Sequence, residues 1–501
     1  MSDNTAVANE LKDKGNLELK NNRYDDAIKY YTEAIALVQS AIYYSNRAQA
    51  HIKSENYGLA IADATKAIEI DPAYLKAYYR RAVAESAILE YKKSLADVKK
   101  VLARAPKDPS CLKLHQDLTK VLKTIAFENA IAVNEKQSPI AELDFDSMII
   151  EAGYKGPELQ IQVDKATKAV STDLDLKYVG EMVELFKEGG KIPKKHAFAI
   201  VCVANQIFKQ EKSLVEIGLK RSKTAASGEL QLEGCETITI CGDTHGQFYD
   251  VLNIFSTFGD TGPNHTYLFN GDFVDRGSWS CEVALLFYCF KILYPQNFYM
   301  NRGNHETNDM NQVYGFADEC KAKYSHKLFL CFSESFNALP YATLIGQEYL
   351  VMHGGLFSDD NIKVDDIRKI DRLKNKQPPK QGIEMELLWT DPQPEEGRSA
   401  SKRGIGMQFG PDVTAKFCEQ NDLKAIIRSH EVRMGGYELE HNGKLITVFS
   451  APNYCDSQHN LGAVINLKTN SDGEYDLDFK TFKEVPHPNI GPMAYTRNMG
   501  F

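Results

Sequence analysis

The first hundred or so residues of the chain repeat with a period near 34. The segments YDDAIKYYTEAI, YGLAIADATKAI and YKKSLADVKKVL begin at positions 24, 57 and 91, which are 33 and then 34 residues apart. A small residue recurs in step upstream of each segment, as Gly15, Ala48 and Ala82. Such a period, with small residues where two helices must approach closely, predicts a stack of helical hairpins that share one core.

This repeat resembles the tetratricopeptide family over residues 7–108. The resemblance implies an all-α solenoid with a groove, because each hairpin can bury its apolar face only against its neighbours. The first repeat departs from the pattern, since Val38 and Gln39 stand where proline is expected. The expected boundaries are three repeats, at 7–40, 41–74 and 75–108, and a capping helix at 109–136.

The residues that follow have a different texture. Helical periodicity weakens between 137 and 175, which we interpret as a linker. From about 176, short apolar strands alternate with helical stretches, a pattern typical of an α/β domain. We expect this domain at 176–490 and a C-terminal tail at 491–501.

The composition argues against several classes of protein. A net charge of −9 and a pI near 5.8 argue against a nucleic-acid binder, and no run approaches the ~18 apolar residues that cross a bilayer. The polar N-terminus MSDNTAVANELKDKG lacks the apolar core of a signal peptide, and the ten cysteines contain no CxxC pair. We therefore expect reduced thiols and a cytoplasmic protein, with the nucleus as a second location. The expected partners include neither nucleic acid nor membrane.

In the second part, six short apolar segments each run into a polar motif, and most of these motifs contain glycine. In α/β proteins the crevice beyond the carboxyl ends of the strands is where ligands bind. Six strand ends of this kind predict one shared site rather than six independent turns. In chain order the motifs are GDTHG (242–246), GDFVDRG (271–277), RGNHE (302–306), HGG (353–355), RSHE (428–431) and APNYC (451–455).

The residue types in these motifs indicate hydrolytic metal chemistry. Asp, His and Asn without cysteine are oxygen and imidazole donors, which suit Mn, Fe or Zn. Two metal ions about 3.5–4 Å apart and bridged by a carboxylate polarise a phosphoryl oxygen and lower the pKa of a bound water to roughly 7. Arg276 offers a planar fork suited to phosphate oxygens.

In this order, the six motifs resemble the phosphoprotein phosphatase family of metal-dependent serine/threonine phosphatases, over about 176–490. The resemblance implies an α/β metallophosphatase domain, with a central β-sandwich flanked by helices, so that the whole chain is multidomain. It also implies two divalent metal ions per domain, Mn, Fe or Zn, with Mn expected in vitro. The implied reaction is hydrolysis of phosphoserine and phosphothreonine in proteins.

The same resemblance gives roles to single residues. Glu306 is a second carboxylate close to His305 in the sequence, so it stays an alternative to Asp275 for orienting that ring. The implied metal ligands are Asp243 and His245 for one ion, Asp272 as the bridge, and Asn304, His353 and His430 for the other. The implied catalytic and phosphate-binding residues are His305 as general acid, Asp275 as its orienter, Arg276, Arg403, Asn304 and Tyr454.

The repeats carry a second candidate site. Charged helix faces are usually only solvated, but the resemblance to chaperone-binding tetratricopeptide proteins implies a carboxylate clamp. Such a clamp holds the acidic C-terminal tail of heat-shock protein 90 or a relative. The five matching positions are Lys12, Asn16, Asn46, Lys76 and Arg80.

The repeats are also expected to regulate the phosphatase domain. Repeat-bearing members of the family fold their solenoid over the active site. Glu55, in the loop between the two helices of the second repeat, is the residue we expect to approach Arg276 or Arg403 and mimic phosphate.

Two other functions are compatible with parts of the sequence. One is a catalytically inert adaptor that works through its repeats, and the presence of every expected ligand and arginine argues against it. The other is a metallophosphoesterase that acts on small phosphates. The APNYC motif and the repeats make that alternative less favoured.

Overall fold

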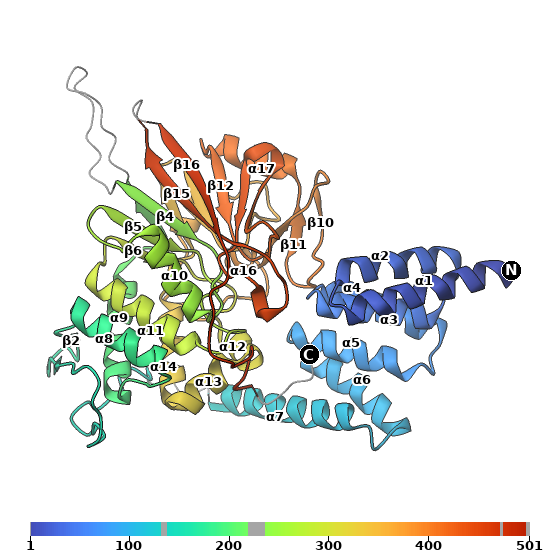
Figure 1. Cartoon of the computed structure of the whole chain (residues 1–501), viewed down its shortest axis with the longest axis horizontal. Helices are drawn as coiled ribbons and strands as arrows, with labels where there is room; N and C mark the ends of the chain where they lie inside the picture. The colour runs from blue at the N-terminus through green and yellow to red at the C-terminus, as the bar shows by residue number, and fades with distance from the viewer. Residues whose placement is uncertain (1, 132–137, 219–235, 471–473, 497–501) are drawn as a thin grey trace. The chain divides into compact units, whose positions relative to one another are not determined.

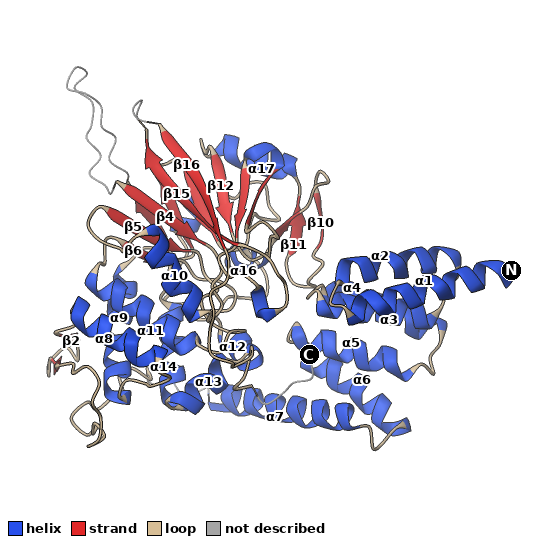
Figure 2. Cartoon of the chain, in the orientation of Figure 1, coloured by secondary structure: helices blue, strands red, loops and turns tan. Residues whose placement is uncertain are grey.

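The structure is a computed structural model that describes residues 2–131, 138–218, 236–470 and 474–496 (Figure 1). The chain divides into two compact units. The first is Met1–Lys136 with Ser399–Gln408 and Arg497–Phe501, and the second is Gln137–Arg398 with Phe409–Thr496. Within the described residues, strands appear only from Ile161 onward, after a run of helices (Figure 2).

The first unit contains the three helical hairpins that the repeat predicts. The second and third hairpins lie inside the predicted repeats 41–74 and 75–108, whereas the first begins at Ser2, ahead of the predicted start at residue 7. The predicted cap is a helix as far as Ile131, and its last residues lie outside the described ones. The helices are α1 Ser2–Lys20, α2 Tyr24–Leu37, α3 Ala41–Lys53, α4 Tyr57–Ile70, α5 Leu75–Ala87, α6 Tyr91–Arg104 and α7 Pro109–Ile131.

Small residues lie where the hairpin helices cross. A Cβ atom added at Gly15 would lie 2.7 Å from Cε1 of Tyr31, whose side chain is fully buried. Ala48 and Ala82, at the matching positions of the other repeats, are also fully buried. The packing of α1 on α2 therefore depends on the absence of a side chain at position 15.

The predicted linker is wrong, because residues 138–175 belong to the second unit. The Ser138 hydroxyl donates to Glu334, at 2.7–2.8 Å from its two carboxylate oxygens. Val170, in strand β2, exchanges two hydrogen bonds of 2.8 Å with the Gln206 amide on helix α9. These contacts join segments far apart in the chain, which a local sequence pattern does not reveal.

The second unit also extends past the predicted end at 490. The backbone N–H of Met493 donates to the Arg276 carbonyl at 2.8 Å, and the Ser278 hydroxyl donates to the Gly491 carbonyl at 2.7 Å. Residues 491–496 of the predicted tail are thus packed on the unit, beside the GDFVDRG loop. Residues 497–501 lie outside the described ones.

Two sheets form the centre of the second unit and confirm the predicted β-sandwich. One has five strands in the order β16-β15-β4-β5-β6, and the other has six in the order β13-β14-β12-β8-β7-β3. In β5, Leu268 belongs to the apolar core shared by both sheets, while Tyr267 and Phe269 belong to the core formed with the helices. Since successive side chains of a strand point to opposite faces, this five-stranded sheet is covered on both sides. Helices α8, α9, α11 and α14 gather beside it in Figure 1.

The topology brings the motif-bearing strand ends together. Strands β4, β5 and β6 are parallel neighbours, as are β8, β12 and β14, so the ends of each set lie at one edge of its sheet. A bridge between Asp243 and Phe449 links β4 and β14 just past their ends. All six motifs follow strands of these two sets, so the predicted convergence is confirmed.

The remaining elements complete the unit. None of the described helices is long and apolar enough to cross a membrane. The strands are β1 Ile161–Val163, β2 Val170–Thr172, β3 Leu214–Ile217, β4 Thr237–Cys241, β5 His265–Phe269, β6 Phe298–Met300, β7 Ala342–Ile345, β8 Tyr349–Met352, β9 Asp391–Pro392, β10 Arg398–Ala400, β11 Met407–Phe409, β12 Ala425–Arg428, β13 Tyr437–Glu440, β14 Leu445–Val448, β15 Gly462–Thr469 and β16 Tyr475–Phe482. The helices are α8 Leu176–Lys187, α9 Lys194–Gln210, α10 Phe248–Phe258, α11 Ser280–Leu293, α12 Asn308–Tyr314, α13 Phe316–Lys323, α14 His326–Asn337, α15 Val364–Arg368, α16 Ile383–Trp389 and α17 Pro411–Gln420, with 3₁₀ turns η1 His441–Gly443 and η2 Tyr454–Asp456.

Candidate active site

The loops that follow these strands turn sharply to aim polar side chains at one point. Seven side-chain-bearing residues of the motifs have left-handed backbone conformations, which such residues adopt rarely and which cluster at functional sites. Gly242 precedes one of these turns, and a Cβ atom there would lie 2.1 Å from the Val448 carbonyl oxygen. The seven are His245 (φ 40°), Asp272 (φ 48°), Asp275 (φ 69°), Arg276 (φ 68°), His430 (φ 71°), Asn453 (φ 43°) and Cys455 (φ 53°).

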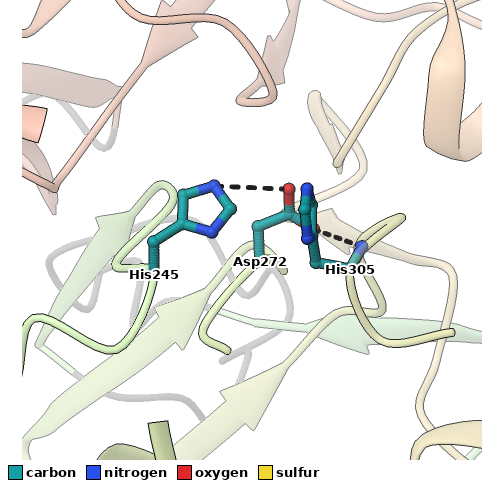
Figure 3. A group of neighbouring side chains, drawn as sticks. All are labelled: His245, Asp272 and His305. Atoms are coloured by element: carbon teal, nitrogen blue, oxygen red, sulfur yellow. Dashed lines mark hydrogen bonds and ion pairs between the residues drawn. The ribbon is translucent and has the colours of Figure 1, made fainter. Parts of the chain in front are cut away.

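Asp272 lies at the centre of the site, between two groups of metal-binding side chains. The first group is around His245 and the second is around His353. The Oδ2 atom of Asp272 is 3.7 Å from Nε2 of His245 (Figure 3) and 3.3 Å from Nε2 of His353. Its Oδ1 accepts the His305 backbone N–H at 2.8 Å, which fixes the direction of the carboxylate. All of these side chains are at least nine-tenths buried. Asp272 therefore faces both groups at once, as a bridging ligand must.

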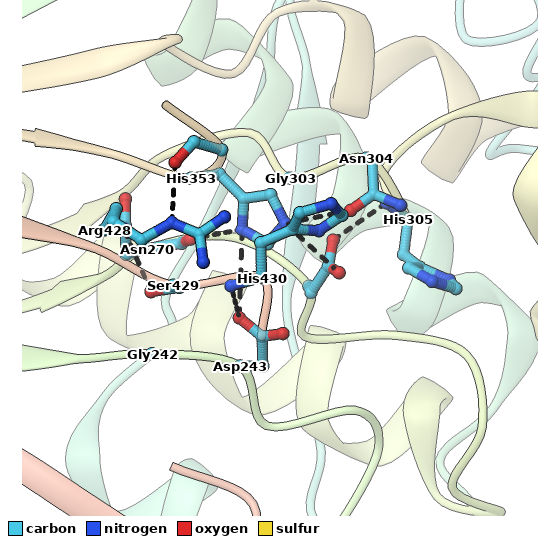
Figure 4. Close-up of polar contacts among 12 residues, drawn as sticks. Gly242, Asp243, Asn270, Gly303, Asn304, His305, His353, Arg428, Ser429 and His430 are labelled. Atoms are coloured by element: carbon cyan, nitrogen blue, oxygen red, sulfur yellow. Dashed lines mark hydrogen bonds and ion pairs between the residues drawn. The ribbon is translucent and has the colours of Figure 1, made fainter. Parts of the chain in front are cut away.

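The second group gathers three donors around one point (Figure 4). Nε2 of His353 is 2.9 Å from Oδ1 of Asn304 and 3.2 Å from Nδ1 of His430. Asp243 lies between the groups, since its Oδ2 is 3.5 Å from Nε2 of His245 and its Oδ1 accepts the His430 backbone N–H at 3.1 Å. The structure thus brings all six predicted metal ligands together.

The orientation of the imidazole rings fits metal binding. Nδ1 of His245 is 3.1 Å from the Val274 carbonyl oxygen, and Nδ1 of His353 is 2.9 Å from that of Asn270. Each carbonyl accepts a hydrogen bond from Nδ1–H, so the Nε2 lone pair faces the cluster, as in metal-binding histidines. His353 and His430 bring two ring nitrogens within 3.2 Å of each other beside two buried carboxylates, a set of donors that suits a divalent cation. The donor set therefore fits two divalent ions that share Asp272.

The electrostatics of the cluster point the same way. Burial raises the pKa of Asp272, but the neighbouring histidines outweigh burial and hold this pKa below its usual range. Burial lowers the pKa of His353, but Asp272 and Asp243 outweigh it and raise this pKa to about 9. The site therefore stabilises positive charge beside its carboxylates, and divalent cations would supply that charge.

His305 stands beside the cluster, held by a buried carboxylate. Its Nδ1 atom is 2.8 Å from Oδ2 of Asp275, which leaves Nε2 for a substrate. Asp275 is fully buried and also accepts from the Asn311 amide at 3.0 Å and from the Phe316 backbone N–H at 2.9 Å. Of the two carboxylates that the sequence left open, Asp275 is the one against the ring.

Glu306 has a different position, which the sequence analysis missed. Its carboxylate accepts three backbone N–H groups, from Asp272 at 2.8 Å, Phe273 at 3.0 Å and Gly303 at 2.8 Å. Burial and the nearby Asp272 carboxylate raise its pKa to about 8. One fully buried side chain thus holds together the two loops that carry Asp272, Asn304 and His305. The only sequence signal was a carboxylate at the end of a ligand-bearing motif.

Besides Asn304, two of the predicted phosphate-binding side chains, Arg276 and Tyr454, lie next to the cluster. The Arg276 guanidinium stacks on the Tyr314 ring at 3.9 Å from its centroid. The Tyr454 ring is 5.1 Å from that of His245. Arg403 lies in the Ser399–Gln408 segment, which belongs to the other compact unit, and its role stays a prediction.

The predicted clamp residues of the first unit are partly linked to one another. Oδ1 of Asn16 accepts from the Asn46 amide at 3.1 Å, and Arg80 donates to Oδ1 of Asn46 at 3.0 Å. Lys76 is exposed, and Lys12 pairs with Asp13 at 3.0 Å. Helices α1, α3 and α5 therefore contribute amide and cationic groups to one surface.

Comparison with known proteins places the chain in a family. It is 51% identical to serine/threonine-protein phosphatase T of Aspergillus oryzae, over 99% of this chain and 98% of that one. It is 46% identical to human serine/threonine-protein phosphatase 5, over 98% of this chain and 93% of that one. The chain belongs to the serine/threonine-protein phosphatase 5 and T family.

Family models and a solved structure agree with this assignment. Residues 236–434 match a calcineurin-like phosphoesterase, residues 41–74 a tetratricopeptide repeat, and residues 115–216 the PPP5 TPR repeat region. A solved protein serine/threonine phosphatase from Saccharomyces cerevisiae, described as similar to human phosphatase PP5, is 53% identical with a TM-score of 0.58. It covers 64% of this chain, and all of that structure is matched. The predicted family and fold class are confirmed.

The role of Glu306 can be tested by substitution. In Glu306→Ala three buried N–H groups lose their acceptor, and each unsatisfied group costs about 1–3 kcal/mol. We expect metal affinity and activity to fall about 10–100-fold, with a lower melting temperature. Glu306→Gln keeps one carbonyl oxygen, so its metal affinity, activity and melting temperature should lie between those of Glu306→Ala and the wild type. Metal content after dialysis and thermal unfolding measure the effect.

The matched control is Glu184→Ala, which removes an exposed carboxylate that pairs with Lys187 in helix α8. It should behave as the wild type. A Glu306→Ala protein with unchanged metal affinity and melting temperature would contradict the role given to Glu306.

Proposed function

We propose that the chain hydrolyses phosphoserine and phosphothreonine in proteins. The observation that carries the proposal is the shared carboxylate of Asp272 with the His305–Asp275 pair beside it. Two-metal clusters of this donor type act on phosphate esters, and the chain belongs to a family named for serine/threonine phosphatases. The two ions bound there would supply Lewis-acid activation of a water and neutralise phosphate charge; Mn, Fe and Zn all suit the donors.

The side chains provide the rest of the chemistry. Arg276 pairs with phosphate oxygens and holds the phosphorus in line with the attacking water. His305 donates a proton from Nε2 to the leaving serine or threonine oxygen, and Asp275 stabilises the charged imidazole through Nδ1. Tyr454 contributes a hydroxyl beside the cluster. We also propose phosphate contacts for Arg403, and a location in the cytoplasm and nucleus.

Phosphate release from a phosphothreonine peptide with added Mn²⁺ tests the proposal. His305→Asn should lower kcat by about 10²–10⁴-fold, because the leaving oxygen then departs without a proton. Asp275→Asn should lower it in the same direction. With p-nitrophenyl phosphate, whose leaving oxygen needs no proton, the His305→Asn loss should be much smaller.

The control for the general acid is His326→Asn, an exposed histidine of α14. This variant should keep full activity on both substrates. Equal losses for His305→Asn on both substrates would contradict the acid role. A wild-type chain without activity would favour the inert adaptor, and activity on small phosphates alone would favour the second alternative.

We further propose that the first unit binds the acidic C-terminal tail of a heat-shock protein 90 type chaperone. The support is the cluster of amide and cationic side chains on α1, α3 and α5. Asn16, Asn46 and Arg80 are joined by hydrogen bonds, so they are already oriented for a carboxylate. Lys12 and Lys76 add charge beside them.

A peptide with acidic residues and a free C-terminal carboxylate tests this interaction. Arg80→Ala and Lys76→Ala should each weaken binding at least tenfold, since a charge-assisted hydrogen bond contributes about 1.5–3 kcal/mol. Lys66→Ala, which removes an exposed lysine paired with Glu69, is the matched control and should bind as the wild type. Unchanged binding by both clamp variants, or equal binding of an amidated peptide, would contradict the clamp.

We also propose that the repeats inhibit the phosphatase, with Glu55 as a phosphate mimic. The support is chemical: Glu55 is a half-buried carboxylate in the turn between α3 and α4, in a left-handed conformation at φ 59°. Because residues 138–175 belong to the second unit, the fragment to compare is 138–501. It should be severalfold more active than the full chain, and Glu55→Gln should raise the activity of the full chain. Equal activity of all three would contradict the proposal.

A further inference from the structure

We propose that Cys281 and Cys320 form a reversible disulfide that reduces activity when the protein meets a peroxide. The effect on activity rests on the proposed phosphatase function, whereas the formation of the bond does not. The two cysteines lie in the second unit, on helices α11 and α13, and neither takes part in the site described above.

The two sulfur atoms are already in contact. Sγ of Cys281 is 3.5 Å from Sγ of Cys320, and both side chains are fully buried. A disulfide has a sulfur–sulfur distance of about 2.05 Å, so the atoms need to approach by roughly 1.5 Å in total. Cys281 is in the first turn of α11, and Cys320 is the fifth residue of the short helix α13. A small shift of one helix end is enough to close the gap.

Both helices are bonded to Asp275, which orients His305. Next to Cys281, the Ser280 hydroxyl accepts the Asp275 backbone N–H at 3.1 Å. At the start of α13, the Phe316 backbone N–H donates to Oδ1 of Asp275 at 2.9 Å. Asp275 is thus held between the ends of the two helices that a disulfide would draw together.

Glu319 ties the same two helix ends. Its carboxylate accepts the backbone N–H groups of Ser280 at 3.1 Å and Cys281 at 2.7 Å, and it precedes Cys320 in the chain. A sulfur–sulfur bond adds a second and shorter link beside this one. Since the cluster tolerates little displacement, a shift at Asp275 moves the His305 ring away from the leaving oxygen.

The reaction balances with hydrogen peroxide as the oxidant. The sulfur of one thiol attacks the O–O bond, becomes a sulfenic acid and releases one water. The second thiol attacks that sulfur, the S–S bond forms and the second water leaves. Two thiols lose two electrons and two protons, and one peroxide becomes two waters. A thiol reductant reverses the bond by exchange.

The surroundings of the two thiols determine the rate of their oxidation. Burial raises the pKa of Cys281 well above its usual range and also raises that of Cys320, so little thiolate is present. Oxidation therefore requires local opening around α13 and a small, uncharged oxidant. Hydrogen peroxide is small and uncharged, and it therefore suits this site better than a bulky disulfide such as oxidised glutathione.

The experiment uses the full chain loaded with Mn²⁺ and treated with hydrogen peroxide. Denaturation, alkylation of free thiols and digestion with trypsin precede mass spectrometry without reduction. We expect a cross-linked pair of peptides that joins Cys320 to Cys281. Fragmentation is needed because Cys289 shares the tryptic peptide of Cys281. The treated protein should lose at least half of its phosphatase activity and regain it with dithiothreitol.

Matched variants separate the pair from other effects. Cys320→Val and Cys281→Val replace a buried thiol by a side chain of similar size. Both variants should keep basal activity, and peroxide should not cause in them the loss of activity that dithiothreitol reverses. Cys455→Ser removes a more exposed thiol near the site and should leave the cross-link and the reversible loss in place.

Three outcomes would overturn the proposal. Free Cys281 and Cys320 after treatment that oxidises Cys455 would mean that the pair only packs in the core. A cross-link without loss of activity would contradict the proposed effect of the disulfide on Asp275. A reversible loss of activity that persists in Cys320→Val would mean that another residue is oxidised. If the untreated chain has no activity, the proposed function fails, and the cross-link is still decided by mass spectrometry.

Discussion

The structure of the second unit depends on one buried carboxylate that faces two groups of donors. Asp272 lies within 3.7 Å of Nε2 of His245 and 3.3 Å of Nε2 of His353, with little water to screen the charges. A buried carboxylate costs free energy unless it is paired, and here its partners are the imidazole rings of His245 and His353. The arrangement is therefore stable as a cluster with bound cations, and the fold acts as its support.

The support comes from the backbone of the two sheets. Parallel strands place the ligand-bearing loops at neighbouring edges, and the Asp243–Phe449 bridge joins those edges. Glu306 then fixes the loops by accepting three backbone N–H groups. The same loops carry His305 and Asp275, the proposed general acid and its partner, so the proposed metal binding and proton transfer depend on one set of contacts.

Much of this arrangement could be predicted from the sequence, because its signals are local. Each strand is a short apolar run, and each ligand follows its strand within a few residues, as in GDTHG after β4. The repeats were also visible, since Gly15, Ala48 and Ala82 recur in step where helices cross. In both cases the physical cause lies within one element or between neighbours in the chain.

The parts that were missed depend on contacts between distant segments. The segment 138–175 has weak periodicity, and its place is set by partners such as Glu334 and Gln206 that lie far along the chain. By sequence, Asp275 was the predicted partner of His305 and Glu306 stayed an alternative to it. Left-handed backbone at Asp275 and the aim of Glu306 at backbone N–H groups decide between them, and neither is visible in the order of residues.

The most direct test of this account is the number of metal ions that the cluster binds and whether they share a ligand. Metal-free full-length protein can be titrated with Mn²⁺ by calorimetry, and electron paramagnetic resonance of the product reports coupling between the ions. The account predicts two ions per chain that are magnetically coupled, and loss of the coupling in Asp272→Asn. One ion per chain, or two uncoupled ions that Asp272→Asn leaves unchanged, would contradict it.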